Sequence, residues 1–414
     1  MKIAVVGGGL AGLAIALGCE KNGHDVTLFE ASTELGGRMK TLREGNHPLD
    51  VGFHVLHTAY STVKDWIDLD ALHIKPMDAC TMTIAPSTGR RRLLGDALRS
   101  PQYLFPTLKS VGVFDGLRFL RWRMRTSARD LERSMDEPTP SIADGLHQRN
   151  FRPSTQRVLR SLFTGITLDP TLSERIAFAD FTWGAMSHGK MVMPRDGIAA
   201  VPHQLAARLR STEVRLNTPV EAVTKSNVVV NGQKQVFDRV VLAVPQHVAQ
   251  RMLPGSVGEH RPNERRTTTV VFVAPEAPFK QARLLLNEEW GDSGHRVLHV
   301  HLPTNLHPHP DGHHWVVATL VGEDAEEVDV EAVKTELIEW FGASVNQWSL
   351  LATTTVRHAL PHIDPQHHAR TLPEVEIDGI LLAGDHRTHP SVQGTLRSAE
   401  RVLKHLDIPV PRRP

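Results

Sequence analysis

The chain has 414 residues, with 47 basic and 46 acidic side chains and a formal net charge of +1. This length favours two domains over a single core, and the balanced charge gives no sign of a nucleic-acid surface. Its two cysteines, Cys19 and Cys80, form no C-x-x-C pair, so we expect neither a disulfide framework nor a cysteine metal site. No run of about 18 apolar residues is present, and a strand-like run starts at residue 2, which leaves no room for a signal peptide. We therefore expect a cytoplasmic protein.

The N-terminal stretch has the pattern of a dinucleotide-binding unit. An apolar run over residues 3–6 is followed at once by Gly7-Gly8-Gly9-Leu10-Ala11-Gly12, and residues 13–17 have the composition of a helix. Gly7, Gly9 and Gly12 therefore fit G-x-G-x-x-G between a strand and a helix. In this motif the first glycine allows a tight turn, the second lets the backbone approach a pyrophosphate, and the third lets helix and strand pack closely. The helix N-terminus, at Leu10 and Ala11, would present free N–H groups to phosphate.

A second apolar run over residues 26–29 ends at Glu30, whose carboxylate can accept hydrogen bonds from ribose hydroxyls. An acid at this point favours an unphosphorylated ribose, and hence FAD or NAD rather than NADP. The chain then continues through Ala31 to Gly36-Gly37-Arg38. This extended fingerprint resembles that of FAD enzymes in the amine oxidase and carotenoid desaturase superfamily. The resemblance implies that Ala31 and Gly37 lie against FAD and that Arg38 pairs with its pyrophosphate.

Residues 50–60 match D-x-G-x-H-x-x-x-x-A-Y, with Asp50, Gly52, His54 and Tyr60 at fixed positions. The pattern resembles plant-type phytoene desaturases and the squalene-associated desaturases of hopanoid synthesis, where this turn passes close to the flavin. Gly52 would allow a close approach of the backbone. His54 has two interpretations, a catalytic residue that faces the flavin or a satisfied core histidine, which is the commoner case. We retain His54 as the candidate catalytic residue.

Three later segments extend the resemblance. Residues 218–223 match a family strand in which the backbone of a valine, here Val220, meets the adenine. Residues 378–385 have the pattern of a turn, a buried strand and Gly384-Asp385, and the family's Gly-Asp carboxylate hydrogen-bonds the ribityl or pyrophosphate region. The last helix begins within residues 390–399, with Val392 near the flavin. A helix N-terminus there would stabilise the negative charge of a reduced flavin.

The resemblance implies an α/β fold, with a Rossmann-like (GR2-type) FAD-binding domain and an inserted α+β substrate domain. We assign residues 1–75, 190–250 and 376–414 to the FAD-binding domain. Residues 76–189 and 251–375 are assigned to the substrate-binding domain. Asn231-Gly232, flanked by β-branched residues, predicts a hairpin turn.

Residues 93–131 have a largely helical composition, and residues 114–125 mix large apolar side chains with arginines at helical spacing. A basic amphipathic helix that contains a tryptophan can lie in a membrane interface. It can also pack its apolar face on its own protein and turn its arginines outward, which is the commoner case. We expect the second arrangement, and peripheral membrane contact is the alternative.

Histidine is unusually frequent, with 24 residues, of which seven lie between residues 295 and 314. His299 and His301 share a face if they lie on a strand. A metal site would need a third ligand and a supporting shell, and nothing in the spacing demands one. We therefore predict no metal site.

The resemblance implies an FAD-dependent desaturase or dehydrogenase, in which a substrate C–H gives hydride to flavin N5 and a neighbouring carbon loses a proton. It also implies an apolar, isoprenoid-like small molecule as substrate, and the residues do not identify the electron acceptor, O2 or a quinone. The protein would mainly orient the substrate and exclude water. Nucleic acid is not an expected partner.

Two other functions stay open. One is an amine oxidase or a protoporphyrinogen oxidase of the same superfamily. Amine oxidases usually place an aromatic residue just before the final helix, whereas this chain has His389-Pro390-Ser391. The polar segment 386–389 could reach the cavity and bind an acidic group, or could face the FAD phosphates. The other is a non-catalytic flavoprotein, although the complete set of cofactor motifs favours chemistry.

Overall fold

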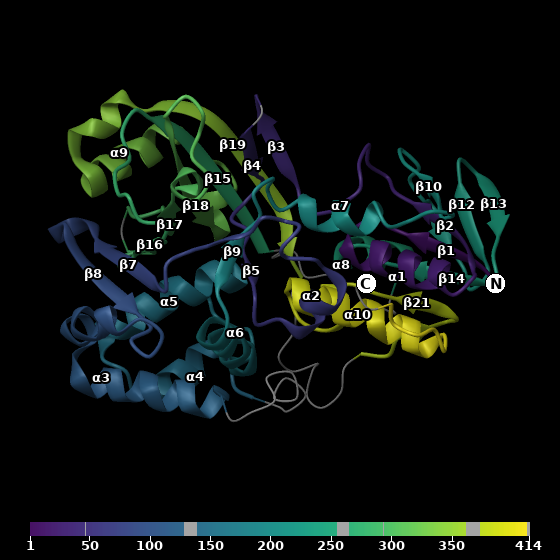
Figure 1. The fold of residues 1–414 in the computed structure, drawn as a ribbon, viewed down its shortest axis with the longest axis horizontal. Helices are drawn as coiled ribbons and strands as arrows, with labels where there is room; N and C mark the ends of the chain where they lie inside the picture. Colours follow the sequence, from purple (N-terminus) through teal and green to yellow (C-terminus); the bar gives the residue numbers. More distant parts are fainter. Residues whose placement is uncertain (46, 128–138, 255–264, 293, 362–372, 412–414) are drawn as a thin grey trace.

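The computed structural model of the chain describes residues 1–45, 47–127, 139–254, 265–292, 294–361 and 373–411. Its strands form two large sheets that lie side by side (Figure 1). The sheet that contains β1 (Lys2–Val6) lies toward the chain ends, and the sheet that contains β15 (Arg265–Ala274) lies on the other side. A group of helices, α3 to α6, lies below the second sheet in this view.

The first sheet has six strands in the order β10-β2-β1-β14-β21-β20. Besides β1 they are β2 (Asp25–Phe29), β10 (Glu213–Arg215), β14 (Arg239–Leu242), β20 (Glu376–Ile377) and β21 (Ile380–Leu382). All neighbours pair in parallel except β20, which is antiparallel to β21. The apolar runs found in the sequence therefore become strands buried on both faces, as parallel sheets require.

The two faces of the first sheet pack against different elements. Ile3 and Val5 face a core shared with α1 (Leu10–Lys21) and α10 (Val392–His405). The intervening residues, Ala4 and Val6, face a core shared with a three-stranded sheet of β11 (Ala222–Val223), β12 (Asn227–Val230) and β13 (Gln233–Val236). The predicted turn between β12 and β13 is confirmed, since Asn231 and Gly232 have φ values of 50° and 71°.

The second sheet has seven strands in the order β19-β15-β18-β17-β16-β7-β8. The strands other than β15 are β7 (Cys80–Ala85), β8 (Arg90–Gly95), β16 (Leu285–Asn287), β17 (His299–His301), β18 (His314–Val321) and β19 (Ser349–Leu360). One face packs on α9 (Val330–Phe341) through Leu337 and Trp340. The two sheets together give a mixed α/β architecture, and the domain boundaries remain a prediction.

The other elements of the described chain include two short sheets and seven helices. Two short sheets pair β3 (Thr41–Glu44) with β4 (His47–Asp50), and β9 (Met191–Met193) with β5 (Leu56–His57) and β6 (Lys75–Pro76). Short helices are α2 (Ser61–Trp66), α7 (Ala200–Ala206) and α8 (Gln246–Met252). The other helices are α3 (Leu104–Ser127), α4 (Ile142–Gln148), α5 (Pro153–Thr167) and α6 (Ile176–His188).

The prediction of a helix over residues 93–131 is only partly correct. Residues 90–95 form β8, because they pair with β7 at the edge of the second sheet. The helix α3 begins at Leu104 and is interrupted at Gly112, whose φ of 78° is not helical. Residues 128–131 lie outside the described part of the chain. Among the described helices, none combines the length and the apolar character needed to span a bilayer.

Candidate functional site

A cavity of about 780 Å³ lies where the carboxyl ends of β1 and β2 meet the start of α1. In open α/β sheets, ligands bind outside the carboxyl ends of the strands. Most of the residues predicted to bind the cofactor line this cavity: Gly7, Gly9, Leu10, Ala11, Glu30, Ala31, Gly37, Arg38, Val220, Gly384, Asp385 and Val392. His54 lines it as well. Gly12 and Gly52 are the two predicted residues that do not.

The turn from β1 into α1 has the geometry of a phosphate cradle. Gly7 has a φ of 107°, a conformation that favours glycine. At Gly9, an added Cβ would meet nothing nearer than the Cα of Gly37, 3.8 Å away, so the approach to this backbone is open. Gly9 is also the N-cap of α1 and provides no side-chain cap. The first N–H groups of the helix are thus left for a ligand, which fits the pyrophosphate of a dinucleotide.

Gly12 lies behind this cradle. An added Cβ there would be 1.9 Å from the carbonyl oxygen of Gly7 and 3.3 Å from Cγ1 of Val5. Only glycine therefore allows α1 to cross β1 this closely. Gly12 shapes the site through packing, which is the role that the motif assigns to its third glycine.

Glu30 is held in place by its neighbours at the end of β2. Its Oε2 accepts a hydrogen bond from the amide of Gly8 at 2.7 Å. Its Oε1 accepts from the amide of Ser32 at 2.8 Å and from the Ser32 hydroxyl at 2.7 Å. An ionised carboxylate has about four lone-pair positions, so acceptor capacity remains for ribose hydroxyls.

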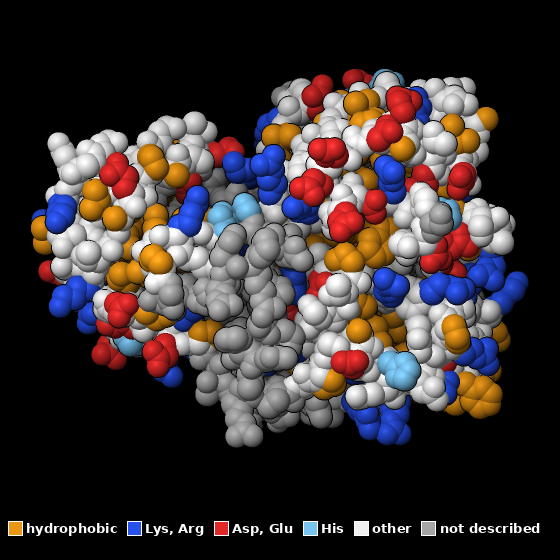
Figure 2. All heavy atoms as spheres, turned by 180° about the vertical axis from the view of Figure 1, so that it is seen from behind, with side chains coloured by type: hydrophobic (Ala, Val, Ile, Leu, Met, Phe, Trp, Pro, Cys, Tyr) orange, Lys and Arg blue, Asp and Glu red, His pale blue; other side chains and the backbone are white. Residues whose placement is uncertain are grey.

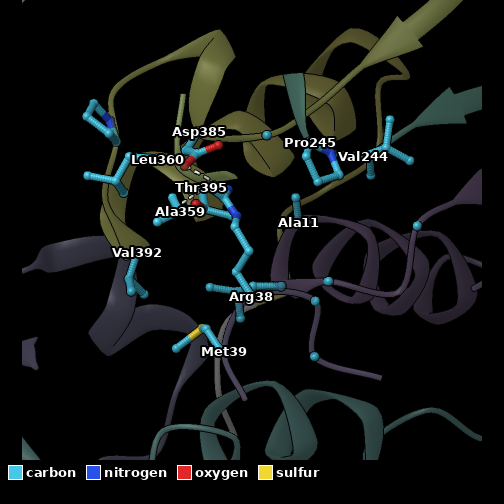
Figure 3. A pocket seen from close by; sticks show the side chains of 18 of the residues that line it. Ala11, Arg38, Met39, Val244, Pro245, Ala359, Leu360, Asp385, Val392 and Thr395 are labelled. Carbon is cyan, nitrogen blue, oxygen red and sulfur yellow. Dashed lines mark hydrogen bonds and ion pairs between the residues drawn. The ribbon is translucent and has the colours of Figure 1, made fainter. Parts of the chain in front are cut away.

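Arg38 joins three segments of the cavity wall (Figure 3). Its Nη2 pairs with Oδ2 of Asp385 at 2.7 Å, and its Nη1 donates to the carbonyl oxygen of Ala359 at 2.8 Å. Asp385 is 4 % exposed and also accepts from the amide of His386. Guanidinium has five N–H donors, so Arg38 can bind Asp385 and Ala359 and still donate to a phosphate.

Gly52 and His54 belong to the loop after β4. His54 lines the cavity, and its Nε2 lies 2.9 Å from the carbonyl oxygen of Val51. A carbonyl only accepts, so Nε2 carries the proton and Nδ1 is the acceptor in the neutral ring. Gly52 has a φ of 96° and borders a second, small cavity behind the loop. Gly52 therefore shapes the loop without lining the main cavity, and the catalytic role of His54 stays a prediction.

His57 was not singled out by the sequence, although it lies three residues after His54. It lines the cavity beside Tyr60, with the two ring centroids 5.1 Å apart. Burial lowers the pKa of His57 to about 4, so the ring is neutral near pH 7. Among the described residues its Nδ1 has no hydrogen-bond partner. A neutral imidazole that has an unused nitrogen can accept a proton or a hydrogen bond.

The segment 386–389 does not contribute to the cavity wall. All four residues are buried, and the wall contains only their neighbours Asp385 and Pro390. His389 packs on Phe181, with ring centroids 4.7 Å apart, and burial lowers its pKa to about 3. The idea that these side chains reach the cavity to bind an acidic group is therefore wrong.

Two further predicted positions lie at helix and strand ends. Ser391 caps α10, where its hydroxyl accepts from the amide of Gly394 at 3.0 Å, and Val392 begins the helix at the cavity wall. Val220 immediately precedes Glu221, whose amide donates to Val229 and starts the pairing with β12. The backbone of Val220 is thus at the edge of that sheet, beside the cavity.

These features define an FAD-dependent oxidoreductase with an α/β cofactor-binding fold. The chain belongs to the flavin-containing amine oxidoreductase family, whose model matches residues 10–402. FAD is its cofactor, and the open Gly9 backbone, the uncapped start of α1 and the anchored Glu30 fit this molecule. When bound there, FAD supplies a two-electron acceptor.

Similar proteins of known sequence or structure agree with this class. A 4,4'-diapophytoene desaturase (4,4'-diaponeurosporene-forming) from Staphylococcus aureus is 48 % identical over 52 residues, which are 13 % of this chain and only 10 % of that protein. An oxidoreductase from Methanosarcina mazei has a TM-score of 0.70 at 16 % identity, over 98 % of this chain and 100 % of its own. A cyclohexylamine oxidase from Brevibacterium oxydans has a TM-score of 0.69 at 16 % identity, and the match covers 98 % of this chain and 99 % of that protein. Such low identities show the fold alone.

Proposed function

We propose that the protein is a desaturase or dehydrogenase that removes two hydrogens from an apolar, isoprenoid-like small molecule. The observation that carries the proposal is the distribution of charge along the cavity wall. The Asp, Glu, Lys and Arg residues of the wall are Glu30, Arg38, Glu221, Arg251 and Asp385. They belong to the segments that contain, or lie near, the predicted FAD-binding residues.

The rest of the wall is the proposed substrate end of the cavity. It includes Phe53, Val55, Ile166 and Phe178, which come from the loop before β5 and from helices α5 and α6. Described residues 53–60 and the described lining residues of α5 and α6 contain no Asp, Glu, Lys or Arg. Burial of an unpaired cation is costly, so this wall favours an uncharged substrate over an ammonium ion.

The region before α10 also disfavours an amine. Pro390 and Ser391 line the cavity there, and neither is aromatic. The short match to a desaturase supports the same choice. The second candidate, an amine oxidase, is supported by the family's description and by the fold shared with cyclohexylamine oxidase.

Within this proposal the chain orients the substrate, excludes water and takes up one proton. Desaturation removes a hydride from one carbon and a proton from its neighbour, and the two electrons of the second C–H bond form the double bond. Nδ1 of His57 is the proposed proton acceptor, because His57 lines the wall and this nitrogen has no hydrogen-bond partner among the described residues. Tyr60 stacks on Phe181 at 5.5 Å and holds the wall beside it.

An anaerobic titration of the FAD-loaded protein tests the substrate class. We expect squalene or a related long-chain isoprenoid, added in detergent micelles, to bleach the flavin absorbance, and putrescine and cyclohexylamine to leave it unchanged. Ile166→Asp should slow the reaction with isoprenoid at least tenfold, because it adds a charge to the apolar wall. Ile166→Asn is the control for shape. Bleaching by amines alone would overturn the proposal in favour of the second candidate.

His57→Leu tests the proton acceptor. We expect the rate of flavin reduction by substrate to fall by roughly 10²–10⁴, the usual contribution of a positioned acid or base. The flavin spectrum and FAD content should stay unchanged, since His57 is not among the predicted FAD-binding residues. His54→Leu is the paired variant: a large loss in that variant, with none in His57→Leu, would assign the role to His54.

A further inference from the structure

Gln393 is a buried amide that is adjacent in sequence to the cavity wall. Figure 2 shows Lys, Arg, Asp and Glu side chains spread over the surface of the molecule, and glutamine is also mostly exposed in folded proteins. Gln393 is only 1 % exposed. It is the second residue of α10 and follows Val392, which begins this helix at the wall of the cavity. Buried polar groups have hydrogen-bond partners, and the partners of Gln393 lie on another helix.

Four hydrogen bonds join the side chain of Gln393 to the first turn of α2. Its Oε1 accepts from the amide of Thr62 at 3.1 Å and from the amide of Val63 at 3.4 Å. Its Nε2 donates to the hydroxyls of Ser61 at 3.1 Å and of Thr62 at 3.0 Å. The first amides of a helix have no acceptor within the helix, and the N-cap of α2, Tyr60, gives no side-chain hydrogen bond. Gln393 therefore satisfies the amides that an N-cap side chain would otherwise satisfy.

Tyr60 connects the first turn of α2 to the wall of the cavity. It lines the cavity and directly precedes the residues that Gln393 binds. Its ring stacks on that of Phe181, with centroids 5.5 Å apart, and lies 5.1 Å from the ring of His57. Its amide also donates to the carbonyl oxygen of His57 at 3.1 Å. The position of the His57 ring thus depends on the segment that Gln393 holds.

The helices α2 and α10 have other contacts that hold them together. Val63 and Trp66 of α2 lie in the same apolar core as Leu396 of α10. At the far end of α2, Nε1 of Trp66 donates to Oε1 of Glu400 at 2.9 Å. The hydrogen bonds of Gln393 are at the opposite end of the helix pair, beside the cavity wall. We conclude that they fix the wall residues more than they fix the pairing of the helices.

From these contacts we propose that Gln393 is a positioning residue, which holds the ring of Tyr60 and, through it, the ring of His57 at the cavity wall. The proposal rests on the proposed function, because His57 is the proton acceptor only there. A base must lie within hydrogen-bond reach of the proton that it takes, and a misplacement of about 1 Å can slow a reaction by roughly 100-fold. The proposed reaction therefore needs a firm support for His57.

Gln393→Met tests the proposal in the FAD-loaded protein, because methionine is similar in length but forms none of these hydrogen bonds. The rate of flavin reduction at saturating isoprenoid should fall on the order of 10- to 100-fold, while the isoprenoid concentration at half-maximal rate changes by less than about threefold. Glu400→Met is the matched control. It removes the bond to Trp66 between the same two helices and should leave the rate within about twofold of the parent's.

NMR of the histidine rings gives a readout that needs no substrate. The resonance of His57, assigned by its loss in His57→Leu, should show a neutral ring down to about pH 5 in the parent, because burial lowers the pKa of His57 to about 4. Gln393→Met should let water reach the ring and raise this pKa by about one unit or more. Glu400→Met should leave it unchanged, since a lower global stability alone does not change the surroundings of the ring.

An unchanged pKa of His57 in Gln393→Met would overturn the proposal, since Gln393 would then only stabilise the fold. Equal changes in Glu400→Met would overturn it too. If Gln393→Met does not fold, Ser61→Ala/Thr62→Val removes the two hydroxyls that accept from Nε2 and should raise the pKa of His57 as well. If isoprenoid does not reduce the flavin of the parent, the proposed function fails, and the pKa of His57 still decides whether Gln393 positions its ring.

Discussion

Gly9→Ala is expected to weaken FAD binding by roughly 100-fold or more while the apoprotein stays folded. Gly9 has a φ of −77° and a ψ of −177°, which alanine adopts readily, and its Cβ would have ordinary contacts only. The apoprotein should therefore lose about 1 kcal/mol of stability or less, the difference between glycine and alanine as an N-cap. The new methyl group would occupy the space through which a pyrophosphate approaches the backbone. Isothermal titration of apoprotein with FAD measures the affinity, and urea unfolding measures the stability.

Gly12→Ala is the matched variant, only three residues away. Its Cβ would collide with the carbonyl oxygen of Gly7 at 1.9 Å, and no side-chain rotation can relieve this contact. We expect it to lower the free energy of unfolding by more than about 3 kcal/mol and to lose FAD as a consequence. The two variants separate a loss of FAD affinity from a loss of stability. If Gly9→Ala binds FAD as tightly as the parent does, the cofactor does not pass over this turn.

Acidification from pH 7.5 to pH 5 is expected to remove several kcal/mol of stability. Burial lowers the pKa of His57 to about 4 and the pKa values of His299, His386 and His389 to about 3, and it also lowers that of His301. In the unfolded chain these groups titrate near 6.5. Below that pH the unfolded chain binds more protons than the folded protein, so stability falls as the pH falls. Each of these histidines contributes a loss of about 2 kcal/mol between pH 7.5 and pH 5.

Buried carboxyl groups act in the opposite direction. Burial raises the pKa of Glu336 to about 7 and raises the pKa values of Glu174 and Asp50 as well. Their uptake of protons in the folded protein recovers part of the loss, and the more numerous histidines determine the net sign. Urea unfolding at several pH values measures the slope. His299→Leu should make this slope shallower by up to about 1.4 kcal/mol per pH unit. A stability independent of pH in this range would contradict the expectation.

Local sequence was enough to predict the glycine turn after the first strand and many of the residues that line the cavity. The first strand, the glycine turn and α1 are contiguous, and Gly12 is required by its contact with Gly7 inside the same unit. The hairpin at Asn231-Gly232 followed from an equally local pattern, whereas the α/β class came from the family resemblance. By contrast, the pairing of Arg38 with Ala359 joins residues 321 positions apart, and no local pattern specifies such a contact.

The other differences have the same origin. Residues 93–95, which were expected to be helical, join a sheet because β7 lies beside them. No sequence pattern distinguishes His57 from the other histidines of the chain, and only the fold shows that it lines the cavity. The segment 386–389 is polar in sequence, yet the packing of α10 and α6 buries it. Periodicity also could not show that α3 buries Trp122 while it leaves Phe105 and Phe114 exposed.

The order of strands in the first sheet has a consequence for synthesis of the protein. β1 lies between β2, its near neighbour in sequence, and β14, and the pairing of β14 with β21 joins Val241 to Leu381. The helix α10, which packs on α1, comes later still. Contacts between such distant segments form slowly and only after both have left the ribosome. The predicted FAD site therefore cannot be complete until the segment that forms β21 and α10 has been made, long after its glycine turn.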